Sequence, residues 1–210
     1  MTAPLSPESQ QKRAFWLRHL HQWHWISSAF CLIAMLLFAA TGITLNHAGQ
    51  IEAHPAVTHK DGKLPALLLS DLRKARKDDA VLPDTVATWL ERESGIRTDH
   101  QAPEWSPEEM YLPMPRPGGD AWLRVDMESG SYEYELTDRG WIAYFNDLHK
   151  GRNTGAVWPW FIDLFAACCL IFSLTGLLLL KMHATNRAAT WPVVGLGLLL
   201  PFLLIVAFVH

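Results

Sequence analysis

The sequence predicts a membrane protein of three transmembrane α-helices, with a periplasmic α+β domain inserted between helices 1 and 2. Three apolar runs, over residues 25–46, 156–180 and 191–209, support the helices, and the polar stretch between the first two runs supports the domain. A hydrocarbon core about 30 Å thick needs about 20 helical residues, a length that the runs reach or approach. The 210-residue chain has a net charge of only −3, and we expect no nucleic-acid partner.

The first transmembrane helix is expected over residues 21–47, after a cytoplasmic segment of residues 1–20. Its apolar run is too long for a cleaved signal peptide, so we interpret it as a retained helix. Lysine and arginine dominate the segment before it, whereas the polar segment after it is acidic overall. The positive-inside rule then predicts a cytoplasmic N-terminus and residues 48–148 outside. In a Gram-negative-type cell the membrane is the bacterial inner membrane and the outside is the periplasm, which is the localisation we expect.

Residues 48–148 are expected to form a folded domain and not a tether. Asp84 and Gly95 suit the N-cap and C′ positions of a helix over 85–94. Alternating strands joined by the Ser129-Gly130 turn predict a β-hairpin. The domain has no phosphate loop, nucleophile motif or paired metal motif. The expected strands and a weaker helix cover residues 110–114, 121–125, 131–136 and 68–77.

The second transmembrane helix is expected within residues 149–183, which include its lead-in. A cytoplasmic link over 184–190 and a third helix over 191–210 follow. Pro192 suits a first helical turn, whereas Pro201 predicts a kink or a local break. The chain contains no Cys-x-x-Cys-His, so any haem would be held without covalent attachment.

Five histidines lie at the ends of the first two long apolar runs: His21, His24, His47, His149 and His183. Histidine is costly in lipid, and its repeated occurrence at these ends needs a reason. Imidazole is a common axial ligand of haem iron, and the space between facing helices often holds a cofactor. Because the two helices cross in opposite directions, we expect His47 to meet His149 on the outer side. His21 or His24 is expected to meet His183 on the inner side, which predicts two b-type haems with two histidine ligands each.

Two alternatives remain open for these histidines. Spacing does not distinguish His21 from His24 as the inner ligand, and His19 is a further candidate. Interfacial histidines can also simply anchor a helix in the headgroups beside tryptophans. Twenty-three residues separate His24 from His47, roughly 35 Å of helix, so one haem would not bridge both ends.

Several further residues suit a cofactor between these helices. Gly42 and Gly176 each follow a threonine and leave room for a macrocycle or another helix. Lys150 and Arg152 are expected to bind haem propionates or an anionic substrate. Asp163 would pair with Arg152, hold a ligand histidine through its second ring nitrogen, relay a proton, or only face headgroups.

Four sequence elements resemble the PepSY-associated transmembrane family: Leu20-His21-Gln22-Trp23, Thr41-Gly42, Leu148-His149-Lys150-Gly151 and Ser173-Leu174-Thr175-Gly176. The turn over residues 125–130 is similar to the hairpin of the PepSY domain. The resemblance extends from about residue 14 to 183 and implies a PepSY-like periplasmic domain. Some members of that family are haem-binding reductases that act on ferric siderophores or other iron chelates. Larger relatives have four or more helices.

The resemblance therefore implies a di-haem electron-transfer protein that reduces a periplasmic ferric chelate or siderophore. The chain has no flavin or nicotinamide domain, so electrons would come from a separate cytoplasmic partner or a membrane quinol. A homodimer would cover the exposed edges of the cofactors. The alternative is a non-enzymatic membrane-anchored module, whose PepSY-like domain binds or inhibits a periplasmic protease or another partner.

Overall fold

The computed structural model describes residues 6–52, 54–77, 81–98, 101–184 and 187–209. Parts of the expected N-terminal segment, the link over 184–190 and the last residue of the third helix lie outside these ranges. The chain divides into two compact units. The first comprises Met1–Leu36 and Phe161–His210, and the second comprises Leu37–Trp160.

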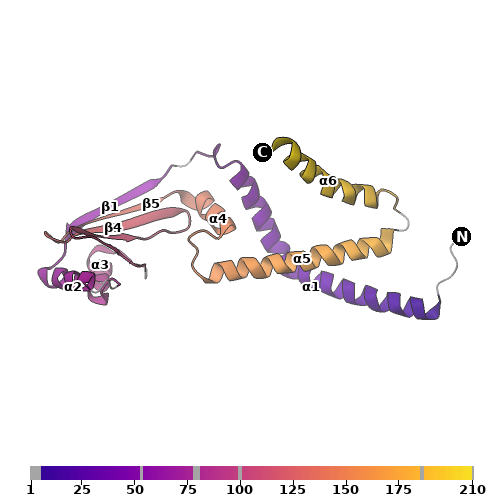
Figure 1. Cartoon of the computed structure of the whole chain (residues 1–210), viewed down its shortest axis with the longest axis horizontal. Helices are drawn as coiled ribbons and strands as arrows, with labels where there is room; N and C mark the ends of the chain where they lie inside the picture. The colour runs from indigo at the N-terminus through magenta and orange to yellow at the C-terminus, as the bar shows by residue number, and fades with distance from the viewer. Residues whose placement is uncertain (1–5, 53, 78–80, 99–100, 185–186, 210) are drawn as a thin grey trace. The chain divides into compact units, whose positions relative to one another are not determined.

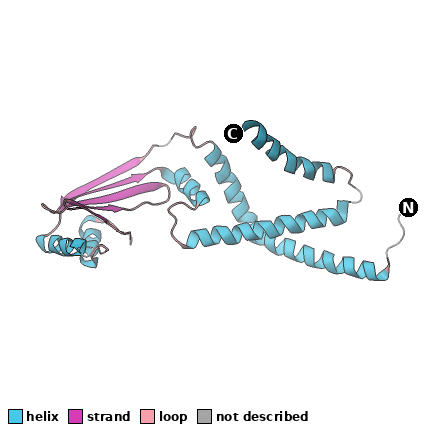
Figure 2. Cartoon of the chain, viewed as in Figure 1, coloured by secondary structure: helices cyan, strands magenta, loops and turns pink. Residues whose placement is uncertain are grey.

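The described helices and strands follow the predicted order of a long helix, an α+β region and two further long helices (Figures 1 and 2). The helices are α1 (Pro7–Asn46), α2 (Ala66–Lys77), α3 (Asp84–Ser94), α4 (Gly140–Lys150), α5 (Val157–His183) and α6 (Thr190–Phe208). The strands are β1 (Ala56–Lys63), β2 (Glu104–Trp105), β3 (Glu109–Pro113), β4 (Gly119–Asp126) and β5 (Ser131–Asp138).

The helices α1, α5 and α6 are each long and apolar enough to cross a membrane. This finding confirms, by length and composition, the three spans that the sequence predicts. Helix α1 has 40 residues and begins at Pro7, because proline suits the first turn of a helix. Much of the expected N-terminal segment is therefore helical.

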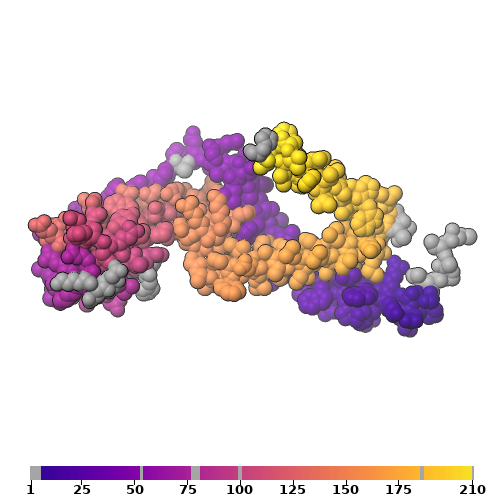
Figure 3. Space-filling model, in the orientation of Figure 1, coloured from indigo at the N-terminus to yellow at the C-terminus, as the bar shows by residue number. Residues whose placement is uncertain are grey.

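In the first unit, α1 and α5 cross each other (Figure 1) and make side-chain contacts. The Arg13 guanidinium donates to the Met182 carbonyl at 3.1 Å. Only 17% of the most apolar stretch of α1, and 11% of that of α5, is buried. Most of both surfaces is therefore free for lipid, a cofactor or another chain. No described residue of α6 is buried, and its atoms are visible along the helix in Figure 3. Of the kink or local break predicted at Pro201, the break is wrong, because Pro201 lies inside the continuous helix α6.

The second unit contains a five-stranded antiparallel sheet of order β1-β5-β4-β3-β2. Alternate residues of β4 are buried, which identifies one face of the sheet as the core face. Helices α2 and α3 cover that face and contribute Leu72, Val86 and Leu90 to a core shared with Leu112 and Leu123.

The predicted hairpin, third strand and two helices are present in this unit. Gly95 is the left-handed residue after α3, as expected, with φ of 62°. The N-cap assignment is wrong by one residue, because Pro83 occupies that position and Asp84 is already helical.

Three elements were not expected from the sequence, namely β1, β2 and α4. Strand β1 is mostly exposed and lacks the alternation that marks a half-buried strand. Most of α4 falls in the expected periplasmic domain, where no helix was predicted, and only His149 and Lys150 fall in the expected lead-in of the second span. Helix α4 is a separate helix that ends at the left-handed Gly151, so His149 belongs to α4 and not to α5.

Candidate functional site

Histidine 24 of α1 is held by three residues of α5 that lie within five positions of one another. Its Nδ1 lies 3.1 Å from both the Phe172 carbonyl oxygen and the Thr175 hydroxyl. The imidazole stacks on the Phe172 ring at a centroid distance of 4.6 Å. A Cβ placed on Gly176 would lie 3.2 Å from His24 Cε1. Any Cβ at this position would push the ring back by a few tenths of an ångström. We call Phe172, Thr175 and Gly176 the first cradle.

Histidine 149 of α4 is held in the same way by three residues of α1, which we call the second cradle: Phe38, Thr41 and Gly42. Its Nδ1 lies 2.6 Å from the Thr41 hydroxyl. The Phe38 ring contacts the imidazole at 4.8 Å between centroids, and a Cβ on Gly42 would lie 3.7 Å from His149 Cε1. Thr41 and Thr175 are both buried.

The two cradles share the sequence Phe-x-x-Thr-Gly, at residues 38–42 and 172–176. Sequence reasoning identified the two Thr-Gly pairs but credited only the glycines with a role. The phenylalanine and the threonine hydroxyl were missed, although the five-residue repeat was a signal that could have revealed them. The repeat also predicts which helix faces hold a histidine, because phenylalanine and threonine three positions apart share one helix face.

The hydrogen bonds of the cradle threonines indicate which ring nitrogen carries the proton. Thr41 donates to the Leu37 carbonyl at 2.9 Å, and Thr175 donates to the Ile171 carbonyl at 2.7 Å. A hydroxyl has one proton, so a threonine that donates to its own helix can only accept from the histidine. For His24, the Phe172 carbonyl can only accept, so Nδ1 carries the proton. For His149, the same direction of the Thr41 bond would leave a lone pair on Nε2, the arrangement of a metal-ligating histidine held through its second ring nitrogen.

The inner candidates His21 and His183 lie together in the first unit. Their ring centroids are 5.8 Å apart and their planes are nearly perpendicular. Each Nδ1 contacts a carbonyl one turn back in its own helix, at Leu17 and Leu179. His19 makes the same kind of contact with the carbonyl of Phe15. Because bonds between imidazole and a metal are about 2 Å long, His21 and His183 are close enough to share one ion.

The expected contact between His47 and His149 is not formed. His47 lies nine residues after Phe38, or two and a half turns at about 3.6 residues per turn, so it lies on the opposite face of α1 from the second cradle. Its Nδ1 contacts the Ile43 carbonyl at 3.0 Å, and its side chain is exposed. The structure therefore places His149, and not His47, in contact with the residues of the second cradle.

The charged candidates Lys150, Arg152 and Asp163 are all exposed. Lys150 and Arg152 flank Gly151, directly after His149. Two cationic residues therefore lie within three positions of this histidine in the sequence. Within the described ranges, no three His, Cys, Asp or Glu side chains converge to hold a bare metal ion. A haem iron requires only two side-chain ligands, and Nε2 atoms with free lone pairs meet that requirement.

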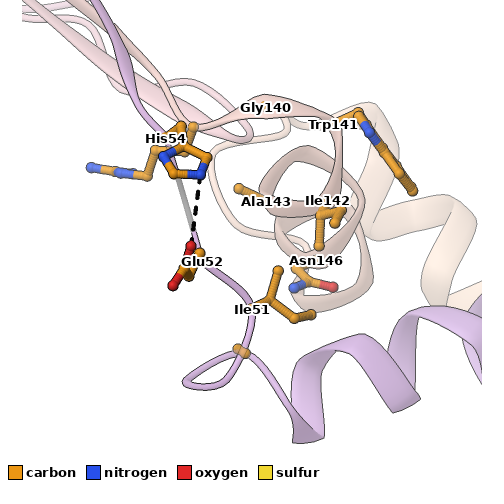
Figure 4. Close-up of a pocket in the computed structure, with 10 residues that line it drawn as sticks. Ile51, Glu52, His54, Gly140, Trp141, Ile142, Ala143 and Asn146 are labelled. Carbon is orange, nitrogen blue, oxygen red and sulfur yellow. Dashed lines mark ion pairs between the residues drawn. The ribbon is translucent and has the colours of Figure 1, made fainter.

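A cavity of about 290 Å³ lies between α4 and the segment that follows α1. Figure 4 shows Ile51, Ile142 and Asn146 on its walls, with Glu52 and His54 at one side. The His54 ring and the Glu52 carboxylate are 3.9 Å apart and both are highly exposed. The Asn146 carboxamide is buried and accepts a hydrogen bond from Thr44 at 2.6 Å.

Comparison with known proteins identifies one family. The model of the family described as PepSY_TM-like matches residues 15–210. The match includes both cradles, the α+β region and all of α5 and α6. No curated protein and no solved structure matches the chain.

Proposed function

The chain belongs to the PepSY_TM-like family of membrane proteins, and we propose that it carries electrons across the bacterial inner membrane to a periplasmic ferric chelate. In this proposal the histidines of α1, α4 and α5 bind two b-type haems. The N-terminus is cytoplasmic and residues 48–148 are periplasmic, in accordance with the flanking charges. The electron donor is a cytoplasmic partner or a quinol.

One observation carries the proposal: His24 and His149 are held by two separate cradles that consist of the same three residue types. A histidine that only anchors a helix in headgroups needs no fixed tautomer and no aromatic partner. Both cradle histidines have Nδ1 within hydrogen-bond distance of a threonine hydroxyl on another helix, and a threonine that accepts there leaves Nε2 available. This is how a protein orients an imidazole ligand before metal binding.

The chain supplies the ligands as follows. His24 or His21 binds the first haem together with His183. His149 is the primary ligand of the second haem. His47 remains the candidate for its second ligand, but its place on the opposite face of α1 predicts a weaker contribution than that of His149. Bound haem would supply reversible one-electron transfer at each site.

Lys150 and Arg152 serve the periplasmic step in this proposal. Both side chains are exposed beside His149, and cations there attract haem propionates or an anionic chelate. Reduction to Fe(II) lowers the charge on the iron and weakens its bonds to hard oxygen ligands. The iron would then leave the chelate on the periplasmic side.

The test is an absorption spectrum and a haem-to-protein ratio for the full chain, purified in detergent after expression with ample haem. We expect two haems per chain, and a Soret band that shifts to longer wavelength when dithionite is added. His149→Ala should lose about half of the haem, and whichever of His24→Ala and His21→Ala loses the other half identifies the ligand that acts with His183. His54→Ala is the matched control, because His54 is an exposed histidine outside both cradles.

A colourless, folded wild-type protein would overturn the proposal. That outcome, with a partner retained by the α+β region in a pull-down from periplasmic extract, would instead support a non-enzymatic membrane-anchored module. Reduction of a ferric chelate outside proteoliposomes, with a reductant enclosed inside, tests the direction of transfer. Loss of that reduction in the two cradle-histidine variants, and not in His54→Ala, is the expected result.

A further inference from the structure

The two cradle histidines differ in the number of acceptors at Nδ1. His24 Nδ1 has two, the Phe172 carbonyl and the Thr175 hydroxyl, each at 3.1 Å. His149 Nδ1 has one within the described part of the chain, the Thr41 hydroxyl at 2.6 Å. A carbonyl oxygen can only accept a hydrogen bond, so the Phe172 carbonyl alone requires a proton on His24 Nδ1.

The His149 tautomer depends on a single side chain. The Thr41 hydroxyl lies 2.9 and 3.2 Å from the carbonyl oxygens of Leu37 and Phe38, and either can accept its single proton. Its oxygen is then free to accept from His149, and the residue is buried, so water does not readily substitute for it. Removing the Thr41 hydroxyl leaves His149 Nδ1 without this acceptor. Removing the Thr175 hydroxyl leaves His24 Nδ1 with the Phe172 carbonyl as its acceptor.

We propose that Thr41 is a positioning residue that selects the Nδ1-protonated tautomer of His149 and so keeps Nε2 available as a ligand. Thr175 has no such role, because the backbone of α5 fixes the His24 tautomer. The purpose of this selection, haem ligation, rests on the proposed function. The tautomer itself is a property of the chain without any cofactor, and it can be measured independently.

The first experiment uses the full chain without haem, labelled with ¹⁵N-histidine, at a pH where imidazole is neutral. Long-range ¹H–¹⁵N spectra distinguish a protonated Nδ1 from a protonated Nε2. We expect Nδ1 protonation at His24 and His149 in the wild type. Thr41→Val should shift His149 toward Nε2 protonation about fivefold, as expected from the loss of one hydrogen bond. Thr175→Val should leave the proton of His24 on Nδ1, because the Phe172 carbonyl still accepts from it. Thr41→Ser should restore the wild-type signal of His149.

Three results would overturn the inference: Nε2 protonation of His149 in the wild type, an unchanged His149 in Thr41→Val, or equal shifts in Thr41→Val and Thr175→Val. The wild-type measurement and Thr41→Ser keep the test decisive even if Thr41→Val fails to fold.

The second experiment measures haem affinity and midpoint potential in the loaded protein. Loss of an outer hydrogen bond to a ligand histidine typically costs 10–100-fold in metal affinity, so Thr41→Val should weaken one haem at least about tenfold. Thr175→Val should change the other haem less, and Thr41→Ser should restore affinity and potential. Equal changes in the two valine variants would contradict the inference. A wild type that binds no haem would refute the proposed function and leave the tautomer result to stand on its own spectra.

Discussion

The first and second cradles use the same three residue types but hold their histidines with different tightness. In the first, Gly176 leaves 3.2 Å for a Cβ beside His24, and the Phe172 ring is almost parallel to the imidazole, at 16°. In the second, Gly42 leaves 3.7 Å beside His149, and the Phe38 ring is tilted by 44°. The first cradle therefore fixes its histidine by packing and backbone contacts, whereas the second relies on one hydroxyl and on the helix that carries the histidine.

That helix is α4, and it is attached to the sheet and to α1 by polar contacts. The Gly118 amide donates to the Asp147 carboxylate at 2.9 Å, and Thr44 donates to Asn146 at 2.6 Å. His149 follows two residues after Asp147. The position of this histidine thus depends on the fold of the α+β region, whereas His24 depends on α1 and α5 alone.

The largest effect that separates the two cradles is expected from Gly118→Ala. Gly118 has φ of +71°, and a Cβ there would lie 2.6 Å from the Cα of Tyr144 in α4. Neither backbone can yield without moving α4, so we expect a loss of about 3 kcal/mol or more in stability. His149 should lose its cradle contact, and its haem, while His24 keeps both. Thermal unfolding followed by tryptophan fluorescence, with haem stoichiometry, measures this.

Gly140→Ala is the matched control for that variant. Gly140 also has positive φ, +82°, but among the described residues a Cβ there would meet nothing within 4 Å. Its cost is the backbone strain alone, about 1–2 kcal/mol. Equal losses in the two variants would show that contact between Gly118 and α4 is unimportant.

A smaller effect, this time on the first cradle, is expected from Gly176→Ala when it is compared with Gly42→Ala. A Cβ at 3.2 Å forces His24 to move by a few tenths of an ångström, and its hydrogen bonds to Phe172 and Thr175 lengthen. A Cβ at 3.7 Å is an ordinary contact, and alanine is about 0.5–1 kcal/mol better than glycine in a helix. Gly176→Ala should therefore weaken haem binding, whereas Gly42→Ala should be neutral or stabilising. Greater haem loss from Gly42→Ala would reverse the comparison.

Sequence patterns could predict the elements of this chain far better than the pairing of its histidines. Length and hydropathy suffice for three spans, and alternation suffices for β4 and β5. Strand β1 was not predicted, because an exposed edge strand has no such alternation of apolar and polar residues. Helix α4 was missed although the stretch Gly-Arg-Asn-Thr-Gly over residues 151–155 separates it from the next apolar run.

The arrangement of the site needed information that no single helix contains. The candidate histidines were identifiable because histidine at a span's end is costly. Their partners were not, because the direction in which each side chain faces depends on where the helices touch. The expected partner of His149 was His47, yet the 38–42 segment of α1 holds His149 on the other face. A comparison of the two Phe-x-x-Thr-Gly segments would have come nearer to the observed contacts than a comparison of histidine positions.

A moderate effect confined to the second cradle is expected from Thr44→Val. The Thr44 hydroxyl donates to Asn146, which is buried, and valine would leave that carbonyl oxygen without its donor. We expect a loss of about 1–3 kcal/mol in stability. His149 should also become more mobile, and Thr44→Ser should restore both properties. Histidine ¹⁵N linewidths and urea unfolding are the measurements. A change at His24 as large as that at His149 would contradict the independence of the two cradles.

The smallest effect is expected at the end of β4 that lies away from α4. Asp126 accepts hydrogen bonds from the Ser129 amide and hydroxyl, and these lower the pKa of its carboxyl below the usual value, with the Ser129 amide as the main cause. The carboxylate therefore stabilises the fold fully above the ordinary aspartate pKa of about 3.9. This contribution is lost as the pH falls through the lower folded-state pKa.

Asp126→Asn should consequently be slightly less stable than the wild type at neutral pH, and the difference should shrink in acid, where the wild-type carboxyl also becomes neutral. Urea midpoints of the full chain between pH 7 and pH 3 measure this convergence. Asp126 lies about 23 Å along β4 from Gly119, at 3.3 Å per residue, so neither His24 nor His149 should change its ¹⁵N signals. A shift at His149 alone would mean that strain travels through β4 to α4, and the dependence of the second cradle on the sheet would then extend over the whole hairpin.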